Sequence, residues 1–321
     1  MELSILIPSR NEIFLARTIE DILKNTEADT EVIAVLDGQW ADPPIPQNER
    51  VNIIYVPESV GQRAATNLAC KLSKAKYVMK VDAHCSFDKG FDRKMIAEMK
   101  DDWTMVPTMR NLWAFSWKCY KCGWKKYQGP TPLKCENCGS TKVRRKMMWI
   151  GKIRPQSNSY SFDSEPHFQY FNEYTKRPEY KEALKTGLTE SMSLQGSCFM
   201  CTRDKYWELN LCDESLGSWG NQGMEVAVKT WLSGGKVMVN HKTWYAHMFR
   251  TQGGDFSFPY KQSGNEVSRT KQKVKDLFFN KTFEGQIYPL KWLITKFKPS
   301  CWDENAIALL NETRNIKFTN I

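Results

Sequence analysis

The sequence predicts an α/β fold built on a Rossmann-like, mostly parallel sheet, with a small cysteine-rich unit inserted into it. Two observations support this prediction. In the first hundred residues, apolar strand-like runs alternate with amphipathic helix-like runs, which is the pattern of a parallel sheet covered by helices. The alternation then stops, and two Cys-x-x-Cys pairs appear between residues 119 and 138.

The elements of the predicted sheet follow one another in a regular order. Residues 3–8 form a continuous apolar run, as expected of a strand buried on both faces. Ser9 and Glu12 match the S-x-x-E capping box, and apolar residues at helical spacing follow them. We expect further strands at residues 31–36, 52–56 and 77–81, and helices near residues 15–23, 64–72, 224–232 and 271–279.

The chain of 321 residues is long enough for one large domain with a subdomain. We interpret residues 1–321 as a single catalytic domain, residues 110–155 as a basic zinc-ribbon insertion, and residues 255–321 as a lid loop with a helical extension. No run approaches the ~20 apolar residues of a membrane span. The apolar run at the start is too short for a signal peptide, so we expect a cytoplasmic protein.

Four cysteines, Cys119, Cys122, Cys135 and Cys138, have the spacing of two metal-binding knuckles. In a reducing compartment this spacing indicates a tetrahedral Zn²⁺ site rather than disulfides. A zinc ion bound by four thiolates has no open position, so we expect a structural zinc ribbon. A third Cys-x-x-Cys, at residues 198–201, lies in an apolar strand-like run and is interpreted as buried cysteines.

Positive charge is concentrated in the same segment. Residues 110–154 contain twelve Lys and Arg and one acid, Glu136, a balance of +11, so the rest of the chain carries −1 of the total +10. Aromatic residues lie between these cations: Trp113, Trp117, Tyr120, Trp124, Tyr127 and Trp149. Cations and stacking aromatics together are typical of nucleic-acid binding. The alternative is a stabilising clip whose tryptophans pack beneath the insertion.

A candidate metal motif follows the strand expected at residues 77–81. Asp82 and His84 are two residues apart, just beyond the carboxyl end of this strand, where ligands bind in parallel sheets. A carboxylate and an imidazole favour Mn²⁺ over Mg²⁺, although either ion can bridge a diphosphate. The alternative is a hydrogen-bonded turn without metal.

Several segments, taken in order, resemble the family 2 glycosyltransferases of the GT-A fold, and the polypeptide N-acetylgalactosaminyltransferases in particular. The resemblance covers residues 1–109 and 190–280. The segments that carry it are residues 5–12, 35–38, 61–67, 80–85, 219–235, 246–250 and 258–260. Residues 80–85 resemble the D-x-H variant of the family's D-x-D metal motif.

The resemblance implies a set of site residues. Asp82, His84 and His247 would bind the Mn²⁺ (or Mg²⁺) ion, and Asp37 would contact the nucleobase of the donor. Arg250 and Tyr260 would contact the diphosphate. Independently of the resemblance, Arg63 could hold phosphate at a helix start, and the equal alternative is a surface arginine. The full donor-binding set is Pro8, Arg10, Glu12, Asp37, Arg63, Asn67 and Tyr260, and the catalytic set is Asp82, His84, Glu225 and Arg250. His167 and His241 are interpreted as structural.

One departure from the family pattern concerns the catalytic base. Gln222 and Gly223 stand where inverting family 2 enzymes have an acidic pair. With no carboxylate there to deprotonate an acceptor hydroxyl, the sequence favours a retaining mechanism, in which the leaving phosphate takes the proton. Asp213, Glu214 and Asp255 remain alternative bases.

These observations together predict a metal-dependent transferase that moves a sugar from a nucleotide-sugar, expected to be a UDP-sugar, to a hydroxyl. The basic segment suggests that this hydroxyl lies on a nucleic acid, such as a hydroxymethylpyrimidine in DNA, as in viral DNA modification in a host cytoplasm. One alternative is a soluble transferase that acts on a protein or glycan. Another is an inactive transferase fold that binds nucleic acid; the intact Asp82, His84 and His247 count against it.

Overall fold

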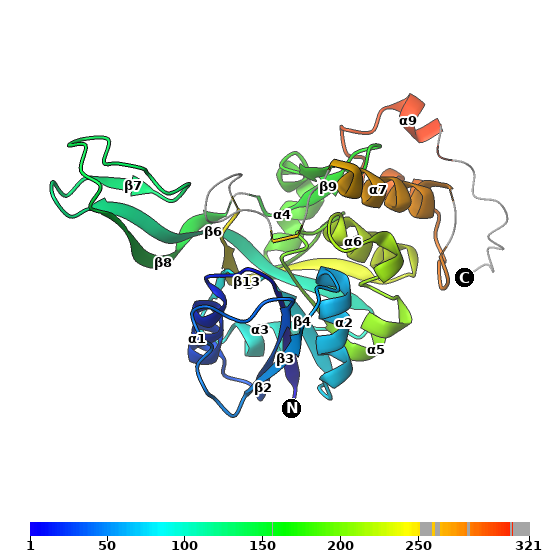
Figure 1. Ribbon diagram of the computed structural model, residues 1–321. Coiled ribbons are helices and arrows are strands. Elements are labelled where there is room, and N and C mark those ends of the chain that lie inside the picture. Colours follow the sequence, from blue (N-terminus) through cyan, green and yellow to red (C-terminus); the bar gives the residue numbers. More distant parts are fainter. Residues whose placement is uncertain (156, 251–258, 261–263, 281–282, 309, 311–321) are drawn as a thin grey trace.

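A computed structural model describes residues 1–321 except 156, 251–258, 261–263, 281–282, 309 and 311–321. Figure 1 shows an α/β body from which a long β-sheet arm projects. The strands are β1 Leu3–Ser9, β2 Thr30–Asp37, β3 Val51–Val56, β4 Tyr77–Val81, β5 Cys85–Phe87, β6 Trp103–Cys119, β7 Lys125–Tyr127, β8 Val143–Pro155, β9 Tyr160–Phe162, β10 Phe168–Tyr170, β11 Leu188–Glu190, β12 Cys198–Thr202 and β13 Lys236–His247.

The helices lie between and after these strands. The α-helices are α1 Leu15–Asn25, α2 Gln62–Leu72, α3 Phe91–Glu98, α4 Pro178–Leu184, α5 Arg203–Glu208, α6 Gln222–Leu232, α7 Gly264–Lys275, α8 Leu290–Phe297 and α9 Glu304–Ala308. The described residues also form two short 3₁₀ turns, Tyr174–Lys176 and Glu214–Leu216, and a π-helical turn, Asp276–Asn280. Within the described ranges, every helix is too short or too polar to cross a membrane.

The main sheet has the strand order β11-β13-β6-β12-β4-β1-β2-β3. The four strands at one end, β3, β2, β1 and β4, are all parallel, so the predicted strand-helix alternation of the first hundred residues is confirmed. β12 lies antiparallel between β4 and β6, and β13 runs parallel to β6. The sheet is therefore mixed: the N-terminal strands and the β6–β13 pair are parallel, whereas β12 and the strands of the arm pair antiparallel.

Alternating side chains of the central strands fill two cores, one on each face of the sheet. Ile5 and Ile7 of β1 join the core formed with α1 and α3. Leu6, between them, joins the core formed with α2, α6 and α8. Both faces of β1 are fully buried, which explains why its sequence is continuously apolar.

Two local predictions differ from the structure. The capping box is wrong: Ser9 is the last residue of β1, and α1 begins at Leu15 without a side-chain cap. The Glu12 carboxylate accepts instead from the backbone N–H of Phe14. The late helix begins at Gly264, earlier than residue 271, and ends in the π-helical turn. Of the predicted lid loop and extension, residues 255–258, 261–263, 281–282, 309 and 311–321 lie outside the described residues.

The basic segment is an extension of the central sheet. β6 leaves the sheet and continues into the arm, where it pairs antiparallel with β8 on one side and with β7 on the other. A third apolar cluster at the base of the arm joins it to the body; its buried members are Phe14, Leu112, Ala114, Phe115, Trp117, Trp149, Ala246 and Met248. The arm is thus fixed to the body by continuous strands and a shared core.

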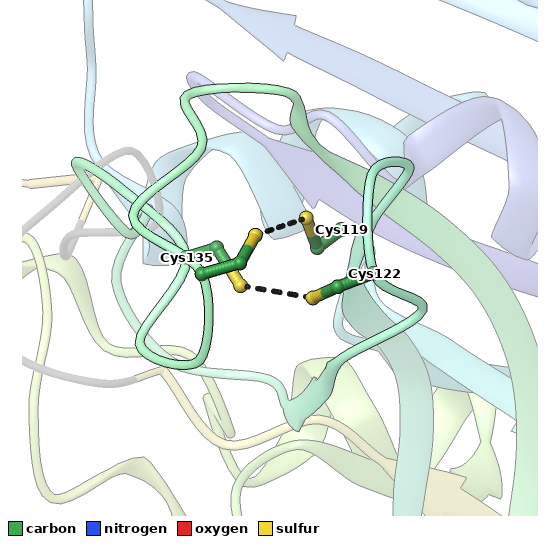
Figure 2. A group of neighbouring side chains, drawn as sticks. Cys119, Cys122 and Cys135 are labelled. Carbon is green, nitrogen blue, oxygen red and sulfur yellow. Dashed lines mark hydrogen bonds between the residues drawn. The ribbon is translucent and has the colours of Figure 1, made fainter.

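The four cysteines predicted to bind zinc converge at the tip of the arm. Their sulfur atoms all lie within 4.8 Å of one another, and Figure 2 shows the side chains of Cys119, Cys122 and Cys135 turned toward a common point. The sulfur-sulfur distances are 3.7 Å for Cys119–Cys138 and 3.5 Å for Cys122–Cys135. A hydrogen bond from the Asn137 amide lowers the pKa of the Cys122 thiol to about 6, which favours the thiolate that a metal requires.

This geometry predicts that the freshly purified protein carries about one tightly held Zn²⁺. Cys122→Ser should lose the ion and expose the arm to limited proteolysis, because its tip has no other core. Cys301→Ser changes an exposed cysteine outside the cluster and should keep the ion. Plasma mass spectrometry measures the zinc content of the parent and of both variants. A parent protein without zinc would contradict the zinc ribbon.

Candidate active site

Three predicted metal ligands meet at the carboxyl end of β4. Asp82 and His84 flank the turn between β4 and β5, and β5 pairs antiparallel with the end of β13, so that His247 lies opposite Cys85. The Nε2 atom of His247 is 3.1 Å from Nε2 of His84 and 3.3 Å from Oδ2 of Asp82. The His84 Nε2 to Asp82 Oδ2 distance is 3.9 Å. Two imidazole nitrogens and one carboxylate oxygen therefore face a common centre.

A buried carboxylate orients the second ligand. Oε2 of Glu12 lies 2.8 Å from Nδ1 of His84 and also pairs with the guanidinium of Arg250. A proton held on Nδ1 by Glu12 leaves the lone pair of Nε2 directed toward Asp82 and His247. A carboxylate behind a ligating histidine is the usual support of a metal site. The donor set fits Mn²⁺, which accepts mixed nitrogen and oxygen ligands.

The charges around the triad are compensated from within the protein. Lys80, 1% exposed, pairs with Asp82 and donates to the carbonyl of Gly196 at 2.6 Å. Burial alone would raise the pKa of Asp82, but Lys80 and the two histidines lower it below its ordinary value. Burial lowers the pKa of His247 to about 4, so this ring is neutral at physiological pH, the state that binds a metal.

A cavity of about 420 Å³ opens over the triad, a volume that suits a nucleotide-sized ligand. Its lining is Pro8, Ser9, Arg10, Glu12, Gln62, Asp82, Ala83, His84, Phe162, Pro166, Phe168, Ser193, Leu194, Gln195, Gly196, Ser197, Trp219, Gly220, Asn221, Gln222, Gly223, Met224, His247, Phe249, Arg250, Pro259 and Tyr260. Among these residues the carboxylates are Glu12 and Asp82, and both are engaged by cations or imidazoles.

Part of the predicted donor-binding set lies on this cavity: Pro8, Arg10, Glu12 and Tyr260, together with Arg250. Arg10 joins two of its walls, because it donates to the carbonyl of Pro259 at 3.0 Å and to the carbonyl of Asp37 at 3.0 Å. Burial raises the pKa of Tyr260, so its hydroxyl remains protonated and can act as a hydrogen-bond donor. The structure therefore brings these residues together around one space.

Asp37 lies behind the cavity wall. Its fully buried carboxylate accepts hydrogen bonds from the Ser59 hydroxyl at 2.9 Å, the Val60 N–H at 2.7 Å and the Gly61 N–H at 3.0 Å. These bonds fix the turn that precedes α2, where Gly61 has a φ of 95° that disfavours a larger side chain. In the described structure Asp37 positions this turn, and its contact with a nucleobase stays a prediction.

The structure contradicts the role predicted for Arg63. The guanidinium is 1% exposed and forms an ion pair with Glu225 at 2.8 Å. It also donates to the carbonyls of Gly217 at 2.9 Å and Gly220 at 2.6 Å. A guanidinium held in this way points away from the cavity, so the phosphate contact is wrong. Arg63 instead fixes the segment that carries Trp219 to the start of α2.

Two more assignments need the same correction. Asn67 donates to the Cys212 carbonyl at 3.0 Å and accepts from the Tyr206 hydroxyl at 2.6 Å, inside the fold rather than at the donor site. Glu225 is fully buried and, besides its ion pair with Arg63, accepts from the Asp213 N–H at 2.7 Å. Glu225 is therefore a positioning residue, because its carboxylate touches no part of the cavity.

Sequence reasoning missed one wall of the cavity. Phe162 and Phe168 come from the β9–β10 hairpin, and Gln222 comes from the first turn of α6. Gln222 donates to the sulfur of Cys212 at 3.0 Å, and its side-chain oxygen is buried without a partner among the described residues. The aromatic residues near position 165 were a possible signal, but no periodicity in the sequence showed which way they face.

Comparisons with known proteins show what the chain as a whole resembles. Residues 4–115 match the sequence profile of Glycosyl transferase family 2. The chain is 20% identical to "Probable N-acetylgalactosaminyltransferase 6" of Caenorhabditis elegans over 86% of its own length and 42% of that protein's. It is 23% identical to human "Polypeptide N-acetylgalactosaminyltransferase 3" over 80% of its own length and 38% of that protein's. The chain carries a glycosyltransferase family 2 domain.

The family 2 domain also has a solved structural neighbour. A crystal structure of GalNAc-T7, determined with UDP, GalNAc and Mn²⁺, superimposes with a TM-score of 0.62 at 18% identity, over 87% of this chain and 49% of that one. This likeness establishes the GT-A fold, and the chain spans about two fifths of the length of the curated relatives it matches.

The geometry of the triad predicts the behaviour of three variants. His84→Ala, His247→Ala and Asp82→Ala should each weaken Mn²⁺ binding at least tenfold, because each removes one of the three ligands. The matched control is His167→Ala, which changes an exposed histidine bonded to Asp163 and should bind Mn²⁺ like the parent. Isothermal titration measures the affinity, and unchanged affinity in all four proteins would contradict the metal site.

The burial of Glu225 predicts a loss of stability. Glu225→Gln leaves the Arg63 guanidinium buried without its counter-charge, so the free energy of unfolding should fall by about 3–5 kcal/mol. Arg63→Met combined with Glu225→Leu should recover part of this loss, because the Arg63 charge is removed as well and the buried Lys229, which also pairs with Glu225, keeps Asp213 at 3.7 Å. Urea unfolding measures the free energy of unfolding of the single and the double variant. A Glu225→Gln protein that is as stable as the parent but unable to transfer sugar would restore the catalytic role predicted for Glu225.

Proposed function

We propose that this chain is a metal-dependent glycosyltransferase that moves a sugar from a nucleotide-sugar, most simply a UDP-sugar, to an acceptor hydroxyl. The observation that carries the proposal is the convergence of Asp82, His84 and His247 on one centre at the floor of a nucleotide-sized cavity. The family 2 profile over residues 4–115 supports it, as does the Mn²⁺ and UDP in the crystal structure of the neighbour GalNAc-T7.

Each part of the site then has a chemical task. Asp82, His84 and His247 would hold Mn²⁺ or Mg²⁺, which supplies counter-charge to the diphosphate of the donor. Arg250, at the cavity edge and paired with Glu12, adds a second positive charge next to the same position. Arg10 and Tyr260 also line the cavity, and Arg10 donates a hydrogen bond to the carbonyl of Pro259. The zinc of the arm would be structural, because all four of its ligands are thiolates.

The cavity favours a retaining outcome. Among the described lining residues, the carboxylates are Glu12 and Asp82. Glu12 contacts His84, and Asp82 belongs to the candidate metal-binding triad. Asp213 and Glu214 are not on the cavity: Asp213 accepts from the Ser215 N–H, and Glu214 accepts from Asn67. Asp255 lies outside the described residues. The leaving phosphate would then take the proton of the acceptor hydroxyl, with Gln222 as a neutral hydrogen-bonding group nearby.

The leading acceptor is a hydroxyl of a polypeptide, which replaces the nucleic acid favoured by the sequence. Two of the relatives that support this acceptor are named for transfer to polypeptides. The cavity wall of Phe162, Phe168 and Trp219 suits a peptide backbone with small side chains, because it is apolar and carries no charge. The comparisons give no support to DNA as the acceptor.

A nucleic-acid hydroxyl remains the second candidate, on one specific observation. The +11 charge balance of residues 110–154 lies in an arm that is continuous with β6, the strand beside the metal-bearing β13. The same core that fixes the arm includes Met248, next to the ligand His247.

One assay tests the activity and separates the two acceptors. The protein with Mn²⁺ and a panel of UDP-sugars is offered a Ser/Thr-rich peptide and, separately, DNA containing hydroxymethylcytosine, and products are read by intact mass. We expect a hexose or N-acetylhexosamine increment on the peptide and none with Asp82→Ala, which lacks a metal ligand. An increment on DNA alone would favour the second candidate. No donor hydrolysis and no transfer with any UDP-sugar would contradict the proposal.

A further inference from the structure

We infer that one face of the arm binds the sugar-phosphate backbone of single-stranded nucleic acid, whichever molecule is the acceptor. This surface, called here the cationic face, is formed by Lys118 of β6, Lys125 and Tyr127 of β7, and Arg144 and Lys146 of β8. None of these residues lines the cavity. The cationic face would therefore bind a partner, and this binding is independent of the transferase chemistry.

The register of the arm places three cations side by side. Lys118 pairs directly with Arg144 across β6 and β8, and with Lys125 across β6 and β7. Paired residues of neighbouring strands point to the same face, about 5 Å apart. Like charges placed directly opposite one another destabilise a sheet, so this row costs free energy in the isolated protein. A bound polyanion would remove that cost.

Among the described residues, no acid forms an ion pair with this row. Between residues 110 and 154 the sole acid is Glu136, and it forms an ion pair with Lys126 at 2.6 Å. Lys126 pairs with Trp117 of β6, so it belongs to the opposite face of the arm. A zinc ion with four thiolates would contribute about −2 at the tip. The arm as a whole keeps a large positive excess.

The opposite face is occupied by packing. Trp117 is 4% exposed, lies against Phe115, and is covered by the guanidinium of Arg145 at 5.4 Å from the ring centre. Trp149 is also buried and donates to Asp21 of α1 at 3.0 Å. These two tryptophans therefore pack beneath the insertion, as in the alternative of a stabilising clip. Trp117 is too buried to stack on a base. The cationic face is the side left open to a ligand.

Exposed aromatic rings accompany the cations on the open side. Tyr127 shares the face of Lys146 through its pairing with Ser116, and 46% of its surface is exposed. The ammonium of Lys152 lies 4.4 Å from the Tyr127 ring centre. Tyr120, 61% exposed, lies next to Lys118. Flat rings beside cations can stack on bases while the cations contact phosphates.

The combination selects nucleic acid among polyanions. Successive residues on one face of a strand are about 6.7 Å apart, so Arg144 and Lys146 present charges at a regular spacing along β8. A phosphodiester chain offers charges at regular intervals and bases for Tyr120 and Tyr127. An acidic polypeptide would satisfy the cations but not the rings. A single strand fits best, because its unpaired bases can reach the aromatic side chains.

The test uses the full chain and a fluorescein-labelled 20-nucleotide oligothymidine, with binding followed by anisotropy between 50 and 200 mM NaCl. The parent should bind at low salt, with affinity that falls steeply as salt rises. The triple variant Lys118→Glu, Lys125→Glu, Arg144→Glu should bind at least tenfold more weakly. The slope of log affinity against log salt concentration should be smaller in magnitude by about 2 for this variant, because three phosphate contacts are lost. Tyr127→Ala should weaken binding without changing the salt slope, because stacking releases few ions.

The matched control reverses three exposed lysines of the body, Lys71, Lys74 and Lys181, and so changes the net charge by the same amount. It should bind like the parent, and all variants should retain their zinc. Equal weakening by the control, or equal affinity of the parent for poly-glutamate, would overturn the inference in favour of unspecific charge attraction. Donor hydrolysis with Mn²⁺ is measured in the same samples. Its retention in the triple variant separates a failure of the arm from a failure of the metal site.

Discussion

The antiparallel pairing of β5 with the end of β13 is the contact on which the site depends. It joins the turn that carries Asp82 and His84 to His247, which is 163 positions away from His84 in the sequence. The register His247↔Cys85 brings the three candidate ligand atoms within 3.9 Å of one another. The cavity lies over this point, and its lining includes Asp82, His84 and His247.

Buried charge explains how the surroundings of the triad are arranged. Lys80 and Glu12 lie directly behind the ligands, and each is almost fully buried, so each needs a partner within the protein. The same rule accounts for Arg63 and Glu225, which tie the start of α2 to α6 and so hold the segment with Trp219 against the cavity. The arm joins this arrangement through Phe14 and Met248, next to Glu12 and His247.

The sequence predicted what local periodicity and spacing determine. The strands and helices up to β4 and the convergence of the four cysteines belong to this class. Spacing also singled out Asp82 and His84 as candidate metal ligands, beside the alternative of a turn without metal, and the family resemblance added His247. The direction of a side chain was not predictable. Arg63, Asn67 and Glu225 lie in family-like segments but turn into the fold. Trp117 and Lys118 lie on opposite faces of β6, as strand alternation requires, but the sequence did not show which face of the arm is packed. Such directions depend on partners far away in the chain, for example Arg63 with Gly220.

We propose that Asp82, His84 and His247 together bind one divalent ion that contacts the donor diphosphate. The decisive experiment is a crystal structure of the protein grown with Mn²⁺ and UDP, with data collected at the manganese absorption edge. We expect one anomalous peak about 2.0–2.3 Å from Nε2 of both histidines and from an Asp82 oxygen, with diphosphate oxygens among the remaining ligands of a six-coordinate ion. A peak elsewhere, or UDP bound with no manganese at the triad, would contradict the claim.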